Sequence, residues 1–147
     1  MRNTRSMLGM PVICRGESIG RVSQVELTED LRALKGIYLY RGVSGTRFIE
    51  GRELDLVGEV AVLARSEGHK ASRSPQSLLR RAIGPDGQRL GAVTDAFVDE
   101  ESLRVAALEV SRGWLEDLTR GRSCVDAYSV CPDGQVLINQ SGGGEMK

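Results

Sequence analysis

The feature that most constrains this sequence is a stretch of twelve residues that occurs twice. Residues 16–27 return as residues 87–98, with glycines at the first and fifth positions of both stretches. The offset of 71 positions still holds at the end of the next apolar run, where Gly42 corresponds to Gly113. A fixed internal period indicates a repeated structural unit. The sequence therefore predicts two copies of one small β unit.

Each copy of the repeat resembles a β-strand whose alternation is interrupted. In the first copy the apolar positions change parity between Val22 and Val25, and the second copy changes parity at the equivalent place. Since side chains alternate between the two faces of a strand, a change of parity requires one extra residue. We predict β-bulges near 23–24 and 94–95, which help a small sheet to curl. The second glycine of each copy is expected at a tight bend or a close backbone approach.

The apolar runs on either side of these strands complete two units. They predict an all-β fold made of two tandem small antiparallel β-barrels, the first over residues 1–65 and the second over residues 75–140. Residues 66–74 between them are polar, contain Gly and Ser and have no apolar period, which is typical of a linker. The Gly-rich residues 141–147 are expected to form a disordered tail.

Size and charge limit how such units become stable and what they attract. Units of roughly 60–65 residues bury only about 60% of their unfolded surface. We therefore expect the two units to pack on each other or on a second chain. The 20 basic and 20 acidic side chains give a net charge of zero. That balance supplies no bulk attraction to nucleic acid or to anionic membranes.

The sequence also bears on the compartment. No apolar run approaches the roughly 20 residues of a membrane span. The N-terminus has a basic start but lacks the sustained apolar region of a signal peptide. The cysteines, Cys14, Cys124 and Cys131, are odd in number and form no CxxC motif, which suits a reducing environment. We predict a cytoplasmic location without a membrane span.

Both copies carry a spaced set of glycines and apolar residues. In the first copy the set is Leu8, Gly9, Pro11, Val12, Gly16, Gly20, Val22, Val25, Ile37 and Leu39, and in the second it includes Gly87, Gly91, Val93 and Asp95. This set resembles the PRC-barrel family, a β-barrel named after the cytoplasmic part of the photosynthetic reaction centre H subunit. Two positions depart from the pattern: Gln24 stands where the family often has Asp, and Arg80 corresponds to Gly9.

The resemblance implies a small, mostly antiparallel barrel that serves as a docking module and has no enzymatic activity of its own. In the reaction centre the domain caps a membrane complex. In the ribosome maturation factor a C-terminal copy accompanies a separate domain and binds a ribosomal protein. The sequence shows neither the transmembrane helix of the first nor the extra domain of the second, so neither role transfers. The family supplies no catalytic residues.

Three aromatic residues are candidates for contact with a partner. Tyr38 and Tyr40 lie on the face of their predicted strand opposite the core residues, where the second copy has Glu109 and Ser111. Burial under a loop and a contact surface are both open for this pair. Trp114 stands at the start of a loop, where buried packing and an interface anchor are the two options. We predict a protein-interaction module whose partner is another protein or a second copy of the chain.

The sequence shows no constellation typical of an enzyme. His69 is the only histidine and lies in the polar linker without the partners of a triad or a metal site. We expect no catalytic residue, metal or cofactor. The acidic turns 28–32 and 99–103 are expected to be solvated hairpin tips rather than carboxylate pairs or cation sites. A small-molecule site between the barrels is a third option, but the sequence shows no polar cluster for it.

One segment of the chain is locally positive. Between positions 65 and 81 five basic residues stand against the single acidic residue Glu67. A solvated linker explains this segment most simply, and contacts with a phosphate backbone are the alternative. The alternative function is therefore an RNA- or ribosome-associated factor. The basic residues are Arg65, Lys70, Arg73, Arg80 and Arg81.

Overall fold

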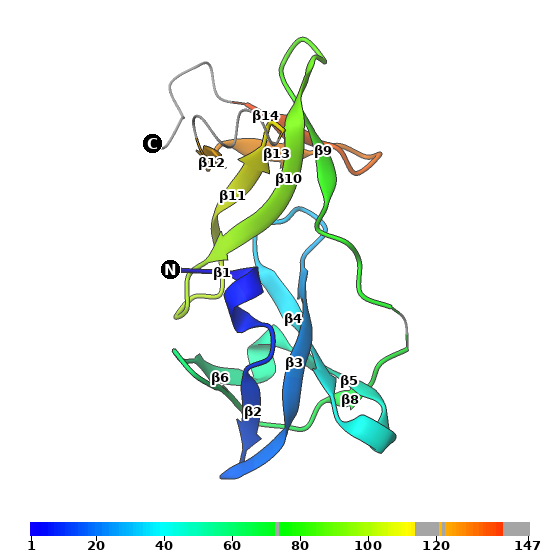
Figure 1. Cartoon of the computed structure of the whole chain (residues 1–147), viewed down its shortest axis with the longest axis vertical. Helices are drawn as coiled ribbons and strands as arrows, with labels where there is room; N and C mark the ends of the chain where they lie inside the picture. Colours follow the sequence, from blue (N-terminus) through cyan, green and yellow to red (C-terminus); the bar gives the residue numbers. More distant parts are fainter. Residues whose placement is uncertain (73, 114–120, 122, 140–147) are drawn as a thin grey trace.

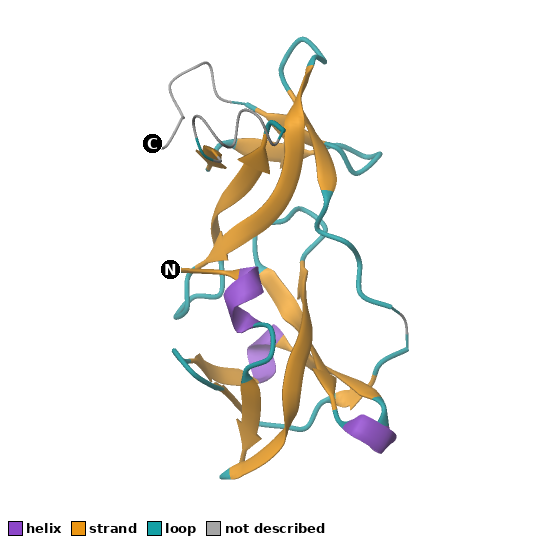
Figure 2. Cartoon of the chain, viewed as in Figure 1, coloured by secondary structure: helices purple, strands orange, loops and turns teal. Residues whose placement is uncertain are grey.

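The computed structural model describes residues 1–72, 74–113, 121 and 123–139. In this part of the chain the fold is all-β, with three short 3₁₀ helices and no α-helix (Figure 2). Two strongly curled sheets of seven strands each lie one after the other along the long axis of the molecule (Figure 1). The predicted fold class is confirmed, and each sheet forms a strongly curled half-barrel.

The first sheet is built by the first copy and has the order β6-β7-β2-β3-β4-β5-β8. Its neighbouring strands are antiparallel, except that β2 pairs with β7 in parallel. Its strands are β2 (Pro11–Cys14), β3 (Glu17–Leu27), β4 (Leu34–Tyr40), β5 (Thr46–Glu50), β6 (Leu54–Val57), β7 (Val62–Ala64) and β8 (His69–Lys70). The short strand β8 comes from the segment expected to be a linker, and it extends this sheet by pairing with β5.

The second sheet has the order β12-β11-β10-β9-β14-β13, and β1 pairs with β10 outside this path. The parallel pair here is β9 and β14. Its strands are β1 (Arg2–Asn3), β9 (Arg80–Ile83), β10 (Arg89–Val98), β11 (Val105–Ser111), β12 (Ser123–Val125), β13 (Tyr128–Val130) and β14 (Val136–Ile138). The 3₁₀ helices are η1 (Thr4–Met7), η2 (Gly42–Ser44) and η3 (Gly51–Glu53).

The predicted β-bulges are present in both long strands. The register between β3 and β4 shifts between Val22 and Gln24, so that one residue of β3 has no partner in the ladder. The register between β10 and β11 shifts between Val93 and Asp95, at the equivalent place. A bulge increases local twist, which accounts for the strong curl of both sheets.

The second glycine of each repeat is where two strands come close together. A Cβ added to Gly20 would lie 2.5 Å from the carbonyl oxygen of Tyr40. A Cβ added to Gly91 would lie 2.1 Å from the carbonyl oxygen of Ser111. Both glycines also have positive φ angles, +149° and +152°, which disfavour other residues. The predicted close approach of the backbone is confirmed at both positions.

The two copies meet through equivalent residues. The contacts are a β-bridge between Ala33 and Arg104, and hydrogen bonds of 2.8 Å from the Leu34 N–H to the Leu103 carbonyl and from the Val105 N–H to the Arg32 carbonyl. Exchanging each residue for the one 71 positions away turns the first hydrogen bond into the second. The contact between the two hairpin tips is therefore symmetric, with equivalent residues in equivalent roles.

The apolar cores of the two sheets form one continuous cluster, so the copies pack on each other within one chain. Tyr128 of the second copy is fully buried, and its hydroxyl donates to the Leu31 carbonyl at 2.6 Å. The guanidinium carbon of Arg32 lies 3.8 Å from the centroid of the Tyr128 ring, and the same guanidinium donates to the carbonyls of Asp126 and Tyr128. Packing between the units was one of the two options open from the sequence.

Each copy is entered by a segment that first contacts the other copy. Strand β1 pairs with β10, and Thr4 and Arg5 bind Asp95 of the second copy before the chain reaches β2. The backbone N–H of Gln76 donates to Glu26 of the first copy, at 3.3 Å, before the chain reaches β9. Arg5 and Gln76 are also 71 positions apart. The first strand of the chain, β1, thus belongs to the second sheet, and β8, within residues 66–74, belongs to the first.

Candidate functional site

Tyr38 lies inside the molecule. Its side chain is 3% exposed, and its ring packs against Phe48 at 5.0 Å between centroids. The Phe48 ring is also 5.8 Å, between centroids, from the ring of His69 in β8. Burial under a neighbouring segment therefore holds for Tyr38, and its position does not support the contact with a partner that the sequence suggested.

The Tyr38 hydroxyl donates to a buried carboxylate. Glu26 is 3% exposed and accepts from Tyr38 at 2.9 Å, from the Gln76 N–H, and from Lys35, whose ammonium lies 3.4 Å away. Burial alone would raise the pKa of Glu26, but these hydrogen bonds outweigh burial and hold the pKa below its ordinary value. A cavity of about 370 Å³ lies beside this group. Its charged side chains are already paired, Lys35 with Glu26 and Glu50 with Arg52.

Tyr40 lies at the surface with 58% of its side chain exposed, close in sequence to the fully exposed Val43. Its position is compatible with the predicted contact, which stays a prediction. Trp114, the third aromatic candidate, lies outside the described residues.

A larger exposed apolar surface lies on the hairpin β6–β7. Leu56 is 48% exposed, Val60 79% and Leu63 39%. Leu56 and Leu63 are directly opposite each other in the ladder, and β6 is the last strand of the first sheet. We call these three residues the outer apolar hairpin. This surface was not predicted from the sequence, although adjacent apolar residues at 56–57 and 62–63 indicate that both faces of the hairpin are apolar.

Of the five basic residues from the linker region, the four that the structure describes are divided between the two copies. Arg65 makes an ion pair with Asp55 at 2.8 Å, and Lys70 is exposed on β8 of the first sheet. Arg80 and Arg81 are neighbours on β9 of the second sheet, so their side chains point to opposite faces. Arg73 lies outside the described residues.

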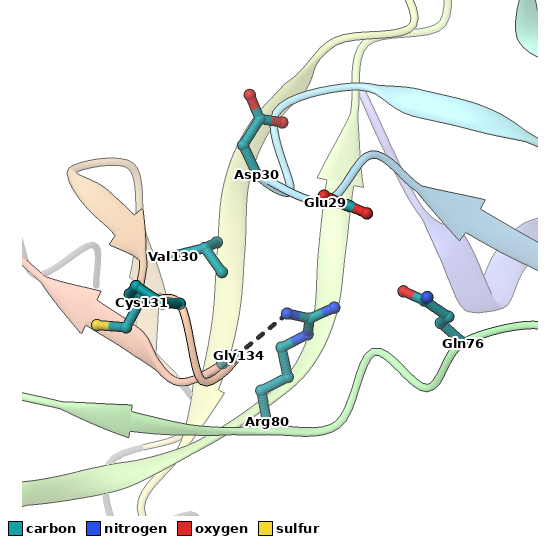
Figure 3. Close-up of a pocket in the computed structure, with 8 residues that line it drawn as sticks. Glu29, Asp30, Gln76, Arg80, Val130, Cys131 and Gly134 are labelled. Atoms are coloured by element: carbon teal, nitrogen blue, oxygen red, sulfur yellow. Dashed lines mark hydrogen bonds between the residues drawn. The ribbon is translucent and has the colours of Figure 1, made fainter.

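A cavity of about 500 Å³ opens where the two copies meet, and we call it the junction pocket (Figure 3). One wall is the hairpin tip between β3 and β4 of the first copy. The opposite wall is β9 with the turn between β13 and β14 of the second copy. The lining residues are Glu29, Asp30, Gln76, Arg80, Val130, Cys131, Pro132 and Gly134.

Charged residues of both signs line the junction pocket. The Arg80 guanidinium extends from β9 toward the space between Gln76 and Glu29 (Figure 3). Its Nη1 donates to the Gly134 carbonyl at 3.2 Å, which fixes the side chain on its own wall. Asp30 accepts from the Thr28 hydroxyl at 2.6 Å and from the Arg32 N–H at 3.0 Å. These two hydrogen bonds lower the pKa of Asp30, so its carboxylate is ionised and held in the turn.

The junction pocket corrects the expectation that no polar cluster lies between the units. Glu29 and Asp30 are exposed at a hairpin tip, as predicted, but this tip faces the second copy. Its partners across the cavity come from residues 76–80 and 130–134, about 50 and 100 positions further along the chain. No local pattern joins segments so far apart, so only the packing of the copies brings them together.

No protein-family model matches the chain, and no curated protein matches its sequence. The two curled half-barrel sheets are consistent with two small β-barrel-like domains. Among the described residues, no helix has the length and apolar character needed to cross a membrane.

Proposed function

We propose that this chain is a non-enzymatic protein-interaction module built from two PRC-barrel-like units and acting on a protein partner in the cytoplasm. The repeated pattern of glycines and apolar residues supports the family, because the curled sheets have the form that this resemblance implies. The docking role of the family supports a binding function. The unit itself then serves as a rigid scaffold for a contact surface.

The observation that carries this proposal is the outer apolar hairpin. Single exposed apolar side chains are common on protein surfaces, whereas contiguous ones mark interaction sites. Here Leu56 and Leu63 face each other across two strands and Val60 stands in the turn that joins them. An edge strand with exposed apolar side chains is also a place where another chain docks.

The surroundings of the outer apolar hairpin fit a protein partner better than nucleic acid. The ion pair of Asp55 with Arg65 lies on this hairpin and its flank, and Glu59 is exposed in the turn. Polar and charged groups of both signs around an apolar centre form the usual rim of a protein interface. A phosphate backbone would instead require a surface of predominantly positive charge.

The test is to place charges on the outer apolar hairpin. The variants Leu56→Lys and Leu63→Glu, alone and together, are compared with Val43→Lys, which changes a more exposed apolar residue in η2, between β4 and β5 of the same unit. Capture of partners from a lysate of the source cell is quantified by mass spectrometry, and self-association is followed by light scattering. We expect the hairpin variants to reduce capture or self-association about tenfold or more, as interface substitutions at buried centres do.

Two outcomes would contradict the proposal. Equal loss with Val43→Lys would show that capture does not depend on the outer apolar hairpin. Unchanged capture with both hairpin charges present would exclude this surface altogether. Binding to RNA that falls steeply with salt, and is reduced by Lys70→Gln and Arg81→Gln, would favour the RNA- or ribosome-associated alternative.

A further inference from the structure

The junction pocket holds opposite charges on opposite walls that do not neutralise each other directly. Arg80 extends into the cavity from the second copy, and Glu29 and Asp30 border it from the first copy (Figure 3). Of the ion pairs formed by the described residues, none joins Arg80 to either carboxylate. A cavity that separates a guanidinium from carboxylates has a positive and a negative end.

The positive end is arranged to hold a carboxylate. A guanidinium has five N–H donors in a planar fork, and its pairs with carboxylates are often bidentate. The contact of Arg80 with the Gly134 carbonyl uses a donor of Nη1 and fixes the orientation of the fork. The remaining edge of the guanidinium faces the cavity (Figure 3).

The negative end is arranged to hold an ammonium group. Asp30 is tied to its own turn by Thr28 and by the Arg32 N–H, so it supplies a fixed negative charge. Glu29 is its exposed neighbour in the same turn and also lines the cavity. A cation at this end meets the Glu29 carboxylate, and Asp30 adds a second negative charge from the same turn.

The charge pattern also selects against ligands of a single sign. An anion bound at Arg80 would face the two carboxylates, and a cation bound at Glu29 would face the guanidinium. A ligand with one charge of each sign satisfies both walls, and specificity of this kind rests on penalties as much as on attractions. Val130 and Pro132 add an apolar part to the lining, and about 500 Å³ lies in the usual range for small-ligand sites.

We propose that the junction pocket binds a short zwitterionic peptide, with its C-terminal carboxylate against Arg80, its N-terminal ammonium against Glu29 and an apolar side chain against Val130 and Pro132. The two walls belong to different copies, so the ligand contacts both. A ligand that binds only the packed arrangement stabilises that arrangement by mass action. This proposal is independent of the outer apolar hairpin and extends the function to a second site.

The probe for the test is the dipeptide alanyl-leucine, added to the isotope-labelled full chain. Backbone amide shifts are followed by NMR, and we expect the shifts to change at 28–32, 76–80 and 130–135. Two blocked forms isolate the charges: the N-acetylated dipeptide lacks the ammonium, and the C-amidated dipeptide lacks the carboxylate. We expect each block to weaken binding roughly tenfold or more, as the loss of a hydrogen bond to a charged group does.

Four variants assign each charge to its wall. Arg80→Gln should weaken binding of the free dipeptide. C-amidation should then have no further effect on binding, whereas N-acetylation should still weaken it. Glu29→Gln should also weaken binding of the free dipeptide, but here N-acetylation should have no further effect, whereas C-amidation should still weaken binding. Arg81→Gln, next on β9 but on its opposite face, and Glu59→Gln, in the β6–β7 turn, are the matched controls and should leave binding unchanged. Dispersed amide spectra of every variant show that the fold is intact.

Several results would overturn the proposal. The first is the absence of saturable shifts around the pocket at millimolar dipeptide. The second is binding that ignores both blocking groups, which would indicate an apolar contact without charge recognition. The third is equal sensitivity of Arg80→Gln and Arg81→Gln. Because Glu29 is exposed at a hairpin tip, Glu29→Gln decides the question even if Arg80→Gln unfolds.

Discussion

Each copy binds the segment that leads into the other copy. The two binding places are equivalent, but the residues that bind differ. In the second copy Asp95, which is fully buried, accepts the Thr4 N–H at 3.0 Å, the Thr4 hydroxyl, and Nε of Arg5 at 2.9 Å. Nη2 of Arg5 also donates to Glu109 at 3.2 Å. A carboxylate pair with an arginine thus fixes the N-terminal segment.

The first copy performs the same task with one carboxylate, a phenol and a lysine. Glu26 accepts from Tyr38, from Lys35 and from the Gln76 N–H of the second entering segment. Tyr38 occupies the position that Glu109 has in the second copy, whereas Glu26 and Asp95 are not equivalent positions. The two copies therefore share the bulge, the glycine at the close approach and the place where a segment of the other copy binds. The polar residues that bind this segment differ.

Substitution of Gly20 and Gly91 tests whether the close backbone approach shared by the two copies requires glycine. Gly20→Ala and Gly91→Ala should each lower the free energy of unfolding by about 3 kcal/mol or more, because the new Cβ would meet a carbonyl oxygen of the next strand. Gly87→Ala is the control, since its Cβ meets nothing within 4 Å, and it should cost about 1 kcal/mol. Urea unfolding measures all three, and equal losses in all of them would contradict the close approach.

Substitution of Asp95 and Glu26 compares how much each carboxylate contributes to stability by binding its entering segment. Asp95→Ala should cost about 3 kcal/mol and Glu26→Ala about 1–2 kcal/mol, since more donors named around Asp95 would be left buried without an acceptor. Deleting residues 1–5 should cost nearly as much as Asp95→Ala and should not add to it. If the losses of stability add when the deletion is combined with Asp95→Ala, Asp95 acts on something other than the entering segment.

Arg32 tests how much the junction depends on one side chain of the first copy. Arg32→Ala removes the contact with the Tyr128 ring and the hydrogen bonds to two carbonyls of the second copy, and should cost about 1–2 kcal/mol. Arg104→Ala changes an exposed arginine at the opposite hairpin tip and should stay within about 0.5 kcal/mol. Thermal unfolding separates the two, and a larger loss for Arg104→Ala would reverse the assignment.

The pH dependence of the first copy is the smallest expected effect. The pKa of Glu26 is lowered in the folded chain from its ordinary value of 4.5. Its stabilising contribution is therefore present above pH 4.5 and is lost as the pH falls through the folded pKa. Urea unfolding between pH 7 and pH 3 should show the stability gap between the natural chain and Glu26→Gln closing on acidification. A gap that widens in acid would show that burial dominates the pKa of Glu26.

Most of the strand architecture was predictable from local patterns. The parity change after Val22 identified the bulge, and the spaced glycines identified the close approach at Gly20 and Gly91. The side-chain environments were less predictable, because Tyr38 and Tyr40 have the same parity on β4 yet one is buried and the other exposed. The difference comes from β8 and the segment after it, which lie against the first sheet. These residues are polar, so the sequence did not indicate that they pair with it.

The sequence by itself determined the duplication, the β class, the bulges and the glycine contacts, since each depends on neighbouring residues and on the two-residue period of a strand. Only the tertiary structure decided that each entering segment crosses to the other copy and that Arg80 faces Glu29 across a cavity. Those arrangements arise when two small units bury their apolar faces against each other. The polar groups around that shared core then meet according to the packing, whatever their distance along the chain.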